Sequence, residues 1–140
     1  MKIVVSPNPY RDKQFKNARQ ACSILREAGA EVALCLPFDV DKTFEIPHDL
    51  RFQDIQKEIK TADMLICFGG DGTILHSSKI ATEHNLPILG VNIGTMGFIA
   101  ELEAGEIELL RKIPKGDYTV EERTMLDVSV GNGRQTLFHE

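Results

Sequence analysis

Short apolar runs alternate along most of the chain with longer stretches in which apolar residues recur every three or four positions. The short runs predict strands, at residues 3–6, 31–36, 63–68 and 88–92. The longer stretches predict helices, at residues 14–28, 50–59, 73–84 and 106–113. Gly29 ends the first of these helices, and Asn85 followed by Pro87 ends the third. This alternation is typical of the α/β class, in which crossover helices join the strands of a parallel sheet.

The pattern changes after residue 116. Residues 118–130 alternate between apolar and polar positions, Gly131-Asn132-Gly133 is a hairpin-type turn, and residues 135–139 predict a returning strand. Such strands are antiparallel, so we predict an α/β domain at residues 1–116 and the beginning of a β-rich second domain at residues 117–140. No terminating signal precedes Glu140, and we therefore expect this second domain to be truncated.

The fully apolar run at residues 63–68 indicates a strand that is buried on both faces, and it leads directly into Gly69-Gly70-Asp71-Gly72-Thr73. Ligands of open α/β sheets bind at the carboxyl ends of strands. The three glycines permit positive φ angles and a close approach of the backbone to a ligand. Together with the N-terminus of the following helix, their N–H groups predict an anion-binding loop.

Asp71 is an unexpected residue in an anion-binding loop, because a carboxylate repels phosphate groups. Its presence is explained if Mg²⁺ lies between them, or if the carboxylate accepts a proton from a hydroxyl group that is being phosphorylated. Both explanations indicate phosphoryl transfer to an alcohol. In the alternative interpretation the loop is only a glycine turn, with Asp71 or Thr73 capping the helix. Because neither a Walker lysine nor the pattern GxGxxG is present, a P-loop enzyme or an ordinary dehydrogenase is disfavoured.

The composition narrows the possible partners. Of the 140 residues, 42% are hydrophobic and 26% are charged, and the net charge is −5. This charge argues against a nucleic-acid or membrane partner, although backbone amides still bind phosphates. The cysteines, Cys22, Cys35 and Cys67, lie in apolar stretches without metal-ligand spacing, so we expect buried thiols, no metal site built from protein ligands, and a reducing cytoplasmic location.

The loop at residues 69–73 resembles the signature shared by NAD kinases, diacylglycerol-type lipid kinases and the phosphofructokinase-like group. A second loop, at residues 90–101, is similar to the NAD kinase pattern Gly-x-Asn-x-Gly-x-Leu-Gly-Phe, with Met96 at the Leu position. Lipid kinases would carry an Asn-Asp pair in place of Gly97-Phe98. The resemblance to NAD kinases extends from Met1 to the start of the β-rich region.

The resemblance implies a Rossmann-like domain and an enzyme that transfers a phosphate from ATP to the 2′-hydroxyl of the adenosine ribose of NAD, giving NADP. The family uses ATP with Mg²⁺ or another divalent metal. By this resemblance Asp71 is the proton acceptor, Gly72 lies against the dinucleotide, and Phe98 packs by the adenine or, alternatively, in the core. The other predicted substrate-binding residues are Gly69, Gly70, Thr73, Leu75, His76, Asn92, Gly94 and Gly97.

Three of these expectations leave alternatives open. Leu75 either walls the pocket or lies in the core, and His76 either reaches the phosphates or carboxamide of the ligand or faces solvent. Residues 8–13 follow the first strand and reach the same edge of the sheet as the glycine loop. Arg11 or Lys13 therefore either contacts nucleotide phosphates or belongs to a solvated basic loop.

The family carries a second signature, Asn followed by Glu or Asp, that these 140 residues lack. We expect it beyond Glu140, in a protein about twice as long whose ligand cleft lies between two domains and which assembles as a homo-oligomer. Two alternatives remain: a nucleotide-binding fragment that is inactive by itself, and a related lipid or sugar kinase. The sequence does not distinguish ATP from polyphosphate as donor, or NAD from NADH as acceptor.

Overall fold

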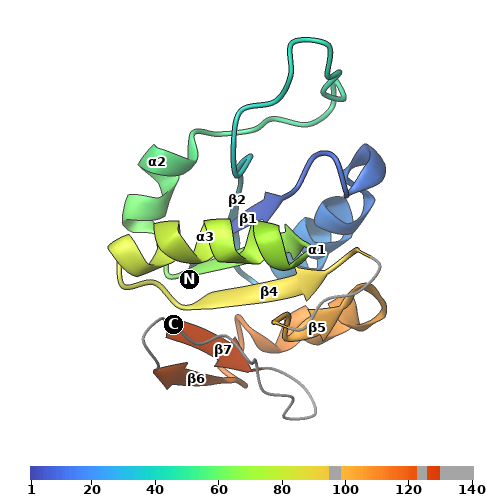
Figure 1. The fold of residues 1–140 in the computed structure, drawn as a ribbon. Helices are drawn as coiled ribbons and strands as arrows, with labels where there is room; N and C mark the ends of the chain where they lie inside the picture. The colour runs from blue at the N-terminus through green and yellow to red at the C-terminus, as the bar shows by residue number, and fades with distance from the viewer. Residues whose placement is uncertain (95–98, 123–125, 130–140) are drawn as a thin grey trace.

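The computed structural model describes residues 1–94, 99–122 and 126–129. Five parallel strands form its main sheet, in the order β2-β1-β3-β4-β5 (Figure 1). These strands are β1 (Lys2–Pro7), β2 (Glu31–Leu34), β3 (Met64–Gly69), β4 (Ile88–Asn92) and β5 (Leu102–Glu103). The helices are α1 (Lys16–Glu27), α2 (Ile55–Glu58), α3 (Asp71–Glu83) and the 3₁₀ helices η1 (Lys13–Phe15), η2 (Ile59–Thr61) and η3 (Ala104–Lys112). The predicted α/β class with a parallel sheet is confirmed.

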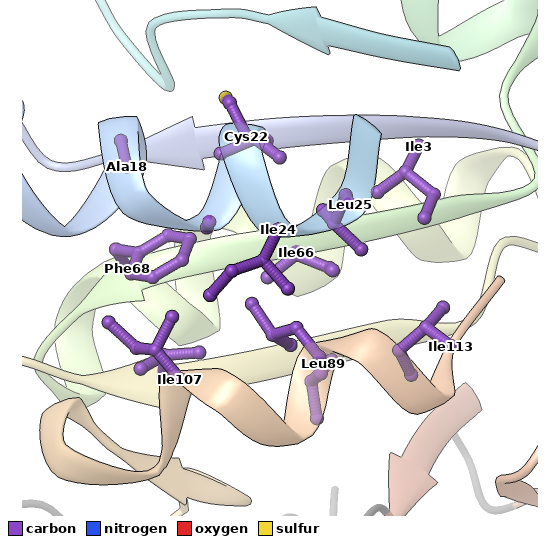
Figure 2. Packing of buried hydrophobic residues seen from close by; sticks show 14 of the residues in the cluster. Ile3, Ala18, Cys22, Ile24, Leu25, Ile66, Phe68, Leu89, Ile107 and Ile113 are labelled. Atoms are coloured by element: carbon purple, nitrogen blue, oxygen red, sulfur yellow. The ribbon is translucent and has the colours of Figure 1, made fainter. Parts of the chain in front are cut away.

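Both faces of the sheet are covered, because successive residues of its central strands are apolar and point to opposite sides. On one side, Ile66 of β3 and Leu89 of β4 pack against α1 and η3. Figure 2 shows Ile24 of α1 and Ile107 of η3 close to these two strand residues. On the other side, Leu65 belongs to a second apolar cluster that includes residues of α2 and α3. The result is a helix–sheet–helix sandwich with a core on each side of the sheet.

The strand order determines where a ligand can bind. The chain passes from β1 to β2 on one side and then returns across β1 to β3, so β1 and β3 are neighbours whose following connections diverge. A crevice forms at such a switch point, at the carboxyl ends of the strands, and ligands of doubly wound sheets bind there. The residues that follow β1 and β3 are therefore the first place to look for a site.

Two of the predicted elements are shorter in the structure. The strand predicted at residues 31–36 ends at Leu34, and Cys35 makes only an isolated bridge to Gln53. The helix predicted at residues 50–59 begins at Ile55, because the Asp54 side chain accepts a hydrogen bond from the Gln56 amide at 3.0 Å and so caps the helix there.

The start of α1 is an unusual turn. Gln14 and Phe15 have positive φ angles of 56° and 54°, a conformation that costs energy for residues other than glycine. The Asp12 carboxylate, which is 1% exposed, accepts hydrogen bonds from the backbone amides of Asn17 and Ala18, each at 2.9 Å. Phe15 is also buried, so the turn is held by a cap and by apolar packing.

A small second sheet follows η3. Strands β6 (Thr119–Glu122) and β7 (Leu126–Ser129) pair antiparallel with each other and lie beside the edge of the main sheet (Figure 1). The antiparallel pair thus forms within the alternating stretch itself. The turn predicted at residues 131–133 and the strand predicted at residues 135–139 lie outside the described residues, and the domain division after residue 116 stays a prediction.

Candidate functional site

A cleft of about 490 Å³ lies at the switch point, at the carboxyl ends of the strands. Its volume is within the usual range for small-molecule sites. Segments that follow β1, β2, β3 and β4 all contribute to it. The described residues that line it are Asn8, Arg11, Phe38, Gly70, Asp71, Gly72, Thr73, His76 and Gly94. The glycine loop predicted from the sequence is thus at the centre of the cleft.

The three glycines of this loop have different surroundings in the structure. None of them has a positive φ, and Gly70 has φ −96°. A Cβ atom at Gly69 would lie 2.6 Å from Cβ and Oγ1 of Thr73, so glycine is needed there to let α3 approach β3. Gly70 and Gly72 have nothing within 4 Å of a Cβ position, which leaves their backbone open to the cleft. The loop therefore does not use the positive φ angles that glycine permits, whereas the accessible backbone that the sequence predicted is present.

Asp71 is the first residue of α3, which begins two residues earlier than predicted. Gly70 occupies the cap position, so the alternative in which Asp71 or Thr73 caps the helix is wrong. Thr73 is instead buried, and its Oγ1 accepts a hydrogen bond from Nδ2 of Asn8 at 2.7 Å. The Asp71 Oδ1 atom accepts a long hydrogen bond of 3.4 Å from the backbone of Ile99. Asp71 therefore stands between the glycine loop and the segment that follows β4.

The two loops that the sequence singled out are neighbours in space. The backbone of Ile93 donates to the carbonyl of Gly69 at 3.2 Å, and a Cβ at Gly94 would lie 3.9 Å from Cα of Gly70. Asn92 is 4% exposed, and its Oδ1 accepts from the Gly94 amide at 3.0 Å. Its Nδ2 donates to Glu103 at 3.2 Å. Asn92 therefore shapes the second loop from beneath, and its contact with a substrate stays a prediction; Gly97 and Phe98 lie outside the described residues.

The structure resolves the alternatives for two residues of α3 differently. Leu75 is 46% exposed, so its assignment to the core was wrong, and its contact with a ligand stays a prediction. His76 is exposed, as the solvent-facing alternative expects, and its contact with a ligand stays a prediction. It lines the cleft, with Nε2 2.9 Å from the carbonyl oxygen of Pro37. Because a carbonyl oxygen only accepts, Nε2 carries a proton. His76 thus fastens the segment after β2 to α3.

Arg11 and Asn8 come from the loop after β1. Arg11 lies in the cleft, and its Nη1 atom is 3.7 Å from the position of a Cβ at Gly94. It therefore brings a permanent positive charge to the glycine loop. Lys13, the other basic candidate, lies in η1 and is not among the described lining residues. Asn8 belongs to the predicted loop at residues 8–13 but was given no role of its own, and its hydrogen bond to Thr73 holds this loop against α3.

Phe38 is the other cleft residue that the sequence did not indicate. It lies in the poorly patterned segment between β2 and α2, which a row of aromatic rings connects to the core. The Tyr10 and Phe38 rings are parallel, with centroids 6.1 Å apart, and Phe44 meets Tyr10 edge-on at 5.3 Å. Phe15 lies 6.1 Å from Phe44 and 4.9 Å from Phe52. The irregular spacing of these residues along the chain gives no periodic signal.

The cysteines lie inside the molecule, as expected. Cys22, Cys35 and Cys67 are buried. Burial raises the pKa of the Cys22 thiol to about 11 and that of Cys35 to about 12. Within residues 1–94, 99–122 and 126–129, no three His, Cys, Asp or Glu side chains are grouped to hold a metal ion. In the same ranges no helix has the length and apolar character needed to cross a bilayer.

Comparison with known proteins identifies relatives of the whole α/β region. The family model described as ATP-NAD kinase N-terminal domain matches residues 2–118. An NAD kinase of Bacteroides fragilis is 32% identical over 130 residues, which cover 91% of this chain and 45% of that protein. An NAD kinase of Corynebacterium diphtheriae is 30% identical over 139 residues, which cover 96% of this chain and 44% of that protein.

A solved structure has the same fold. The crystal structure of yeast NADH kinase complexed with NADH superposes with a TM-score of 0.62 at 21% identity, over 88% of this chain and 40% of that one. The chain therefore spans less than half the length of the relatives it matches.

Proposed function

Because the chain belongs to the ATP-NAD kinase family, we propose that the protein containing it transfers the terminal phosphoryl group of ATP to the 2′-hydroxyl of the adenosine ribose of NAD, giving NADP and ADP. The observation that carries this proposal is the position of Asp71, at the first turn of α3 and inside the cleft where the glycine loop and the segment after β4 meet. The family match favours this reaction over that of a lipid or sugar kinase.

In the proposed reaction, Asp71 orients the 2′-hydroxyl and accepts its proton. The hydroxyl oxygen then forms a bond to the γ-phosphorus, and the bond from that phosphorus to the β,γ-bridging oxygen breaks, releasing ADP. General-base catalysis of this kind contributes about 10²- to 10⁴-fold to the rate. The carboxylate belongs to a helix whose Thr73 is tied to Asn8, so its backbone position is well defined.

Two features of the cleft support binding of the donor phosphates. The N-terminal turn of α3 presents backbone N–H groups and a partial positive charge, and Gly70 and Gly72 leave that backbone accessible. Arg11 adds a full positive charge on the β1 side. We propose that these groups bind the phosphates and stabilise the charge that develops during transfer.

A divalent metal ion accompanies ATP in this proposal. Asp71, the one carboxylate among the described lining residues, is assigned to the hydroxyl proton, so an ion such as Mg²⁺ would be held mainly by the nucleotide phosphates. When bound, the ion would neutralise phosphate charge beside Asp71. The protein's own contributions are the carboxylate, the helix terminus and Arg11.

On the acceptor side, we propose that Gly72 lies against the dinucleotide and that Phe98 packs by its adenine, as the family resemblance implies. Leu75, an exposed residue of α3, would add an apolar surface. Asn92 would act through the shape of the second loop.

We further propose a cytoplasmic protein that assembles as a homo-oligomer through its β-rich part. The buried free thiols of Cys22 and Cys35 support a reducing compartment.

The proposal is tested by measuring NADP formation from NAD and MgATP with the full-length protein, using an NADP-specific dehydrogenase as the readout. Asp71→Ala should lower kcat by about 10²- to 10⁴-fold. Asp117→Ala is the matched control, because that exposed carboxylate lies outside the cleft and should leave kcat unchanged. Turnover by Asp71→Ala at the wild-type rate would refute the catalytic assignment. Absence of NADP formation by the folded wild-type protein would refute the proposed reaction.

A further inference from the structure

We infer that the Phe38 ring is the stacking surface for the base of the phosphate donor, so that the protein binds the donor as a nucleotide and not only as a chain of phosphates. This inference rests on the proposed function and concerns the same cleft. It begins from the place of Phe38, which lines the cleft together with the anion-binding turn of α3.

Phe38 stands where two hollows meet. A larger hollow of about 1070 Å³ lies between the segment after β2 and α3, and Phe38 and His76 line both it and the cleft. A nucleotide whose phosphates occupy the cleft at Gly70–Thr73 therefore has space for its base past the Phe38 ring. The polar side chains of Gln53 and Gln56 also line the larger hollow and offer hydrogen-bond partners to the edge of a base.

The ring is held in place before any ligand binds. Tyr10 is parallel to it, and the His76 ring is inclined to it by 72° at a centroid distance of 6.1 Å. The residue before Phe38 is fixed to α3 by the hydrogen bond between Pro37 and His76. The Tyr10 hydroxyl accepts a hydrogen bond from the Asp41 amide at 2.8 Å, which fixes the segment on the other side. A preset aromatic surface loses little entropy when a base stacks on it.

The position of Phe38 assigns it to the donor. It follows β2, whereas Gly94 and the loop that contains Phe98 follow β4, and β1 and β3 lie between them. Three strand spacings of about 4.8 Å separate β2 from β4, or roughly 14 Å. Asp71 follows β3, between the two ends. If the acceptor lies at the β4 end, as proposed above, the ring on the β2 side is left for the base of the donor, on the other side of the reacting groups.

The inference predicts different effects of Phe38 on the affinities for a nucleoside triphosphate and for inorganic tripolyphosphate. Stacking of a base on an aromatic ring is a sequence-tolerant interaction, and loss of such a ring weakens binding by about tenfold or more. A phosphate chain without a base gains nothing from the ring. Phe38 should therefore matter for a nucleoside triphosphate and be irrelevant to inorganic tripolyphosphate.

The experiment is calorimetric titration of the full-length protein, saturated with NAD, with the non-transferable β,γ-imido analogue of ATP and, separately, with tripolyphosphate. Phe38→Leu should weaken binding of the analogue about tenfold and leave binding of tripolyphosphate unchanged. Phe38→Trp, which keeps an aromatic ring, should bind the analogue as tightly as the wild type does. Equal weakening for both ligands would show that the ring only shapes the cleft and would overturn the inference. Unchanged binding of both ligands would overturn it as well. So would a separate titration in which Phe38→Leu weakens only the binding of NAD.

Phe44→Leu is the matched control. Phe44 lies in the same segment as Phe38 and packs on Tyr10 and Phe15. It is not among the described residues that line either hollow. It should leave the ratio of the two affinities unchanged. Because titration requires no turnover, a protein that fails to make NADP but shows the Phe38-dependent difference would refute the proposed reaction without refuting base stacking.

Discussion

At the scale of single residues, the glycines of the cleft loop differ in whether they have room for a side chain. Gly69 is a packing residue, because a methyl group there would overlap the β-carbon of Thr73, which cannot move without shifting α3. We predict that Gly69→Ala lowers the free energy of unfolding by about 1–3 kcal/mol, the usual cost of overpacking. Chemical denaturation monitored by circular dichroism measures this change.

Gly72→Ala is the companion to that substitution. No atom lies within 4 Å of the Cβ position, and alanine favours helix, so the stability should be unchanged or higher. If Gly72 lies against the dinucleotide as proposed, the same variant should bind NAD more weakly, as calorimetry would show. A Gly72→Ala protein that binds NAD as the wild type does would contradict the proposed contact.

The buried thiols make a prediction about alkaline pH. Burial raises the pKa values of Cys22 and Cys35 in the folded state to about 11 and about 12, from the ordinary value of 9.0 for a thiol. The unfolded chain therefore loses these protons first, and stability falls as pH rises above 9. The double variant Cys22→Ala/Cys35→Ala should lose less stability between pH 9 and 11, by up to about 1.4 kcal/mol per pH unit for each thiol. Parallel stability curves for the two proteins would contradict this.

At the scale of elements, α1 depends on a carboxylate that precedes it. Asp12 accepts hydrogen bonds from two amides at the start of the helix while Gln14 and Phe15 are held at positive φ. We predict that Asp12→Ala lowers the free energy of unfolding by about 1–2 kcal/mol, as loss of a helix cap does. Asp49→Ala is the control, because this exposed partner of Arg19 caps nothing and should change the stability little. Equal effects of the two substitutions in denaturant titrations would argue against the cap.

Elements with a strong local signal were predictable from the sequence. The predicted strand at residues 88–92 coincides with β4, and α3 ends where Asn85, at φ 52°, allows it to end. Strand β5 was missed because two residues are too few for any periodicity, and it pairs only through its position beside β4. The conformation of the segment between β2 and α2 could not be predicted from the sequence, because it depends on aromatic contacts with Tyr10 and Phe15, which are distant in the sequence.

The same division holds for the site. Glycine, aspartate and threonine next to a buried strand are a local signal, and Gly70, Asp71 and Thr73 line the cleft, although their contact with a substrate stays a prediction. Asn8 and Phe38 reach the cleft only because β1 and β2 end at the same edge of the sheet as β3. Whether such residues meet depends on strand order, which single-residue patterns do not contain.

At the scale of the whole molecule, the cleft is formed by the carboxyl ends of four strands, and the chain spans less than half of its relatives' length. If the remaining part supplies the other side of the dinucleotide site, residues 1–140 alone should bind NAD at least about tenfold more weakly than the full-length protein. Each lost factor of ten corresponds to about 1.4 kcal/mol of interaction. Calorimetry on both proteins, with circular dichroism to verify folding, measures the difference. Equal affinity would show that the α/β domain is a sufficient binding unit.

The row of rings from Phe52 through Phe15, Phe44 and Tyr10 to Phe38 also has a practical consequence for spectroscopy. The 140 residues contain no tryptophan, so a tryptophan at Phe44 would be the single indole fluorophore of this chain. It would lie in the middle of the row, between the buried Phe15 and the rim of the cleft. Its emission wavelength and quenching by iodide would then report when the segment between β2 and α2 closes on a ligand or detaches from the core, in real time and without a label.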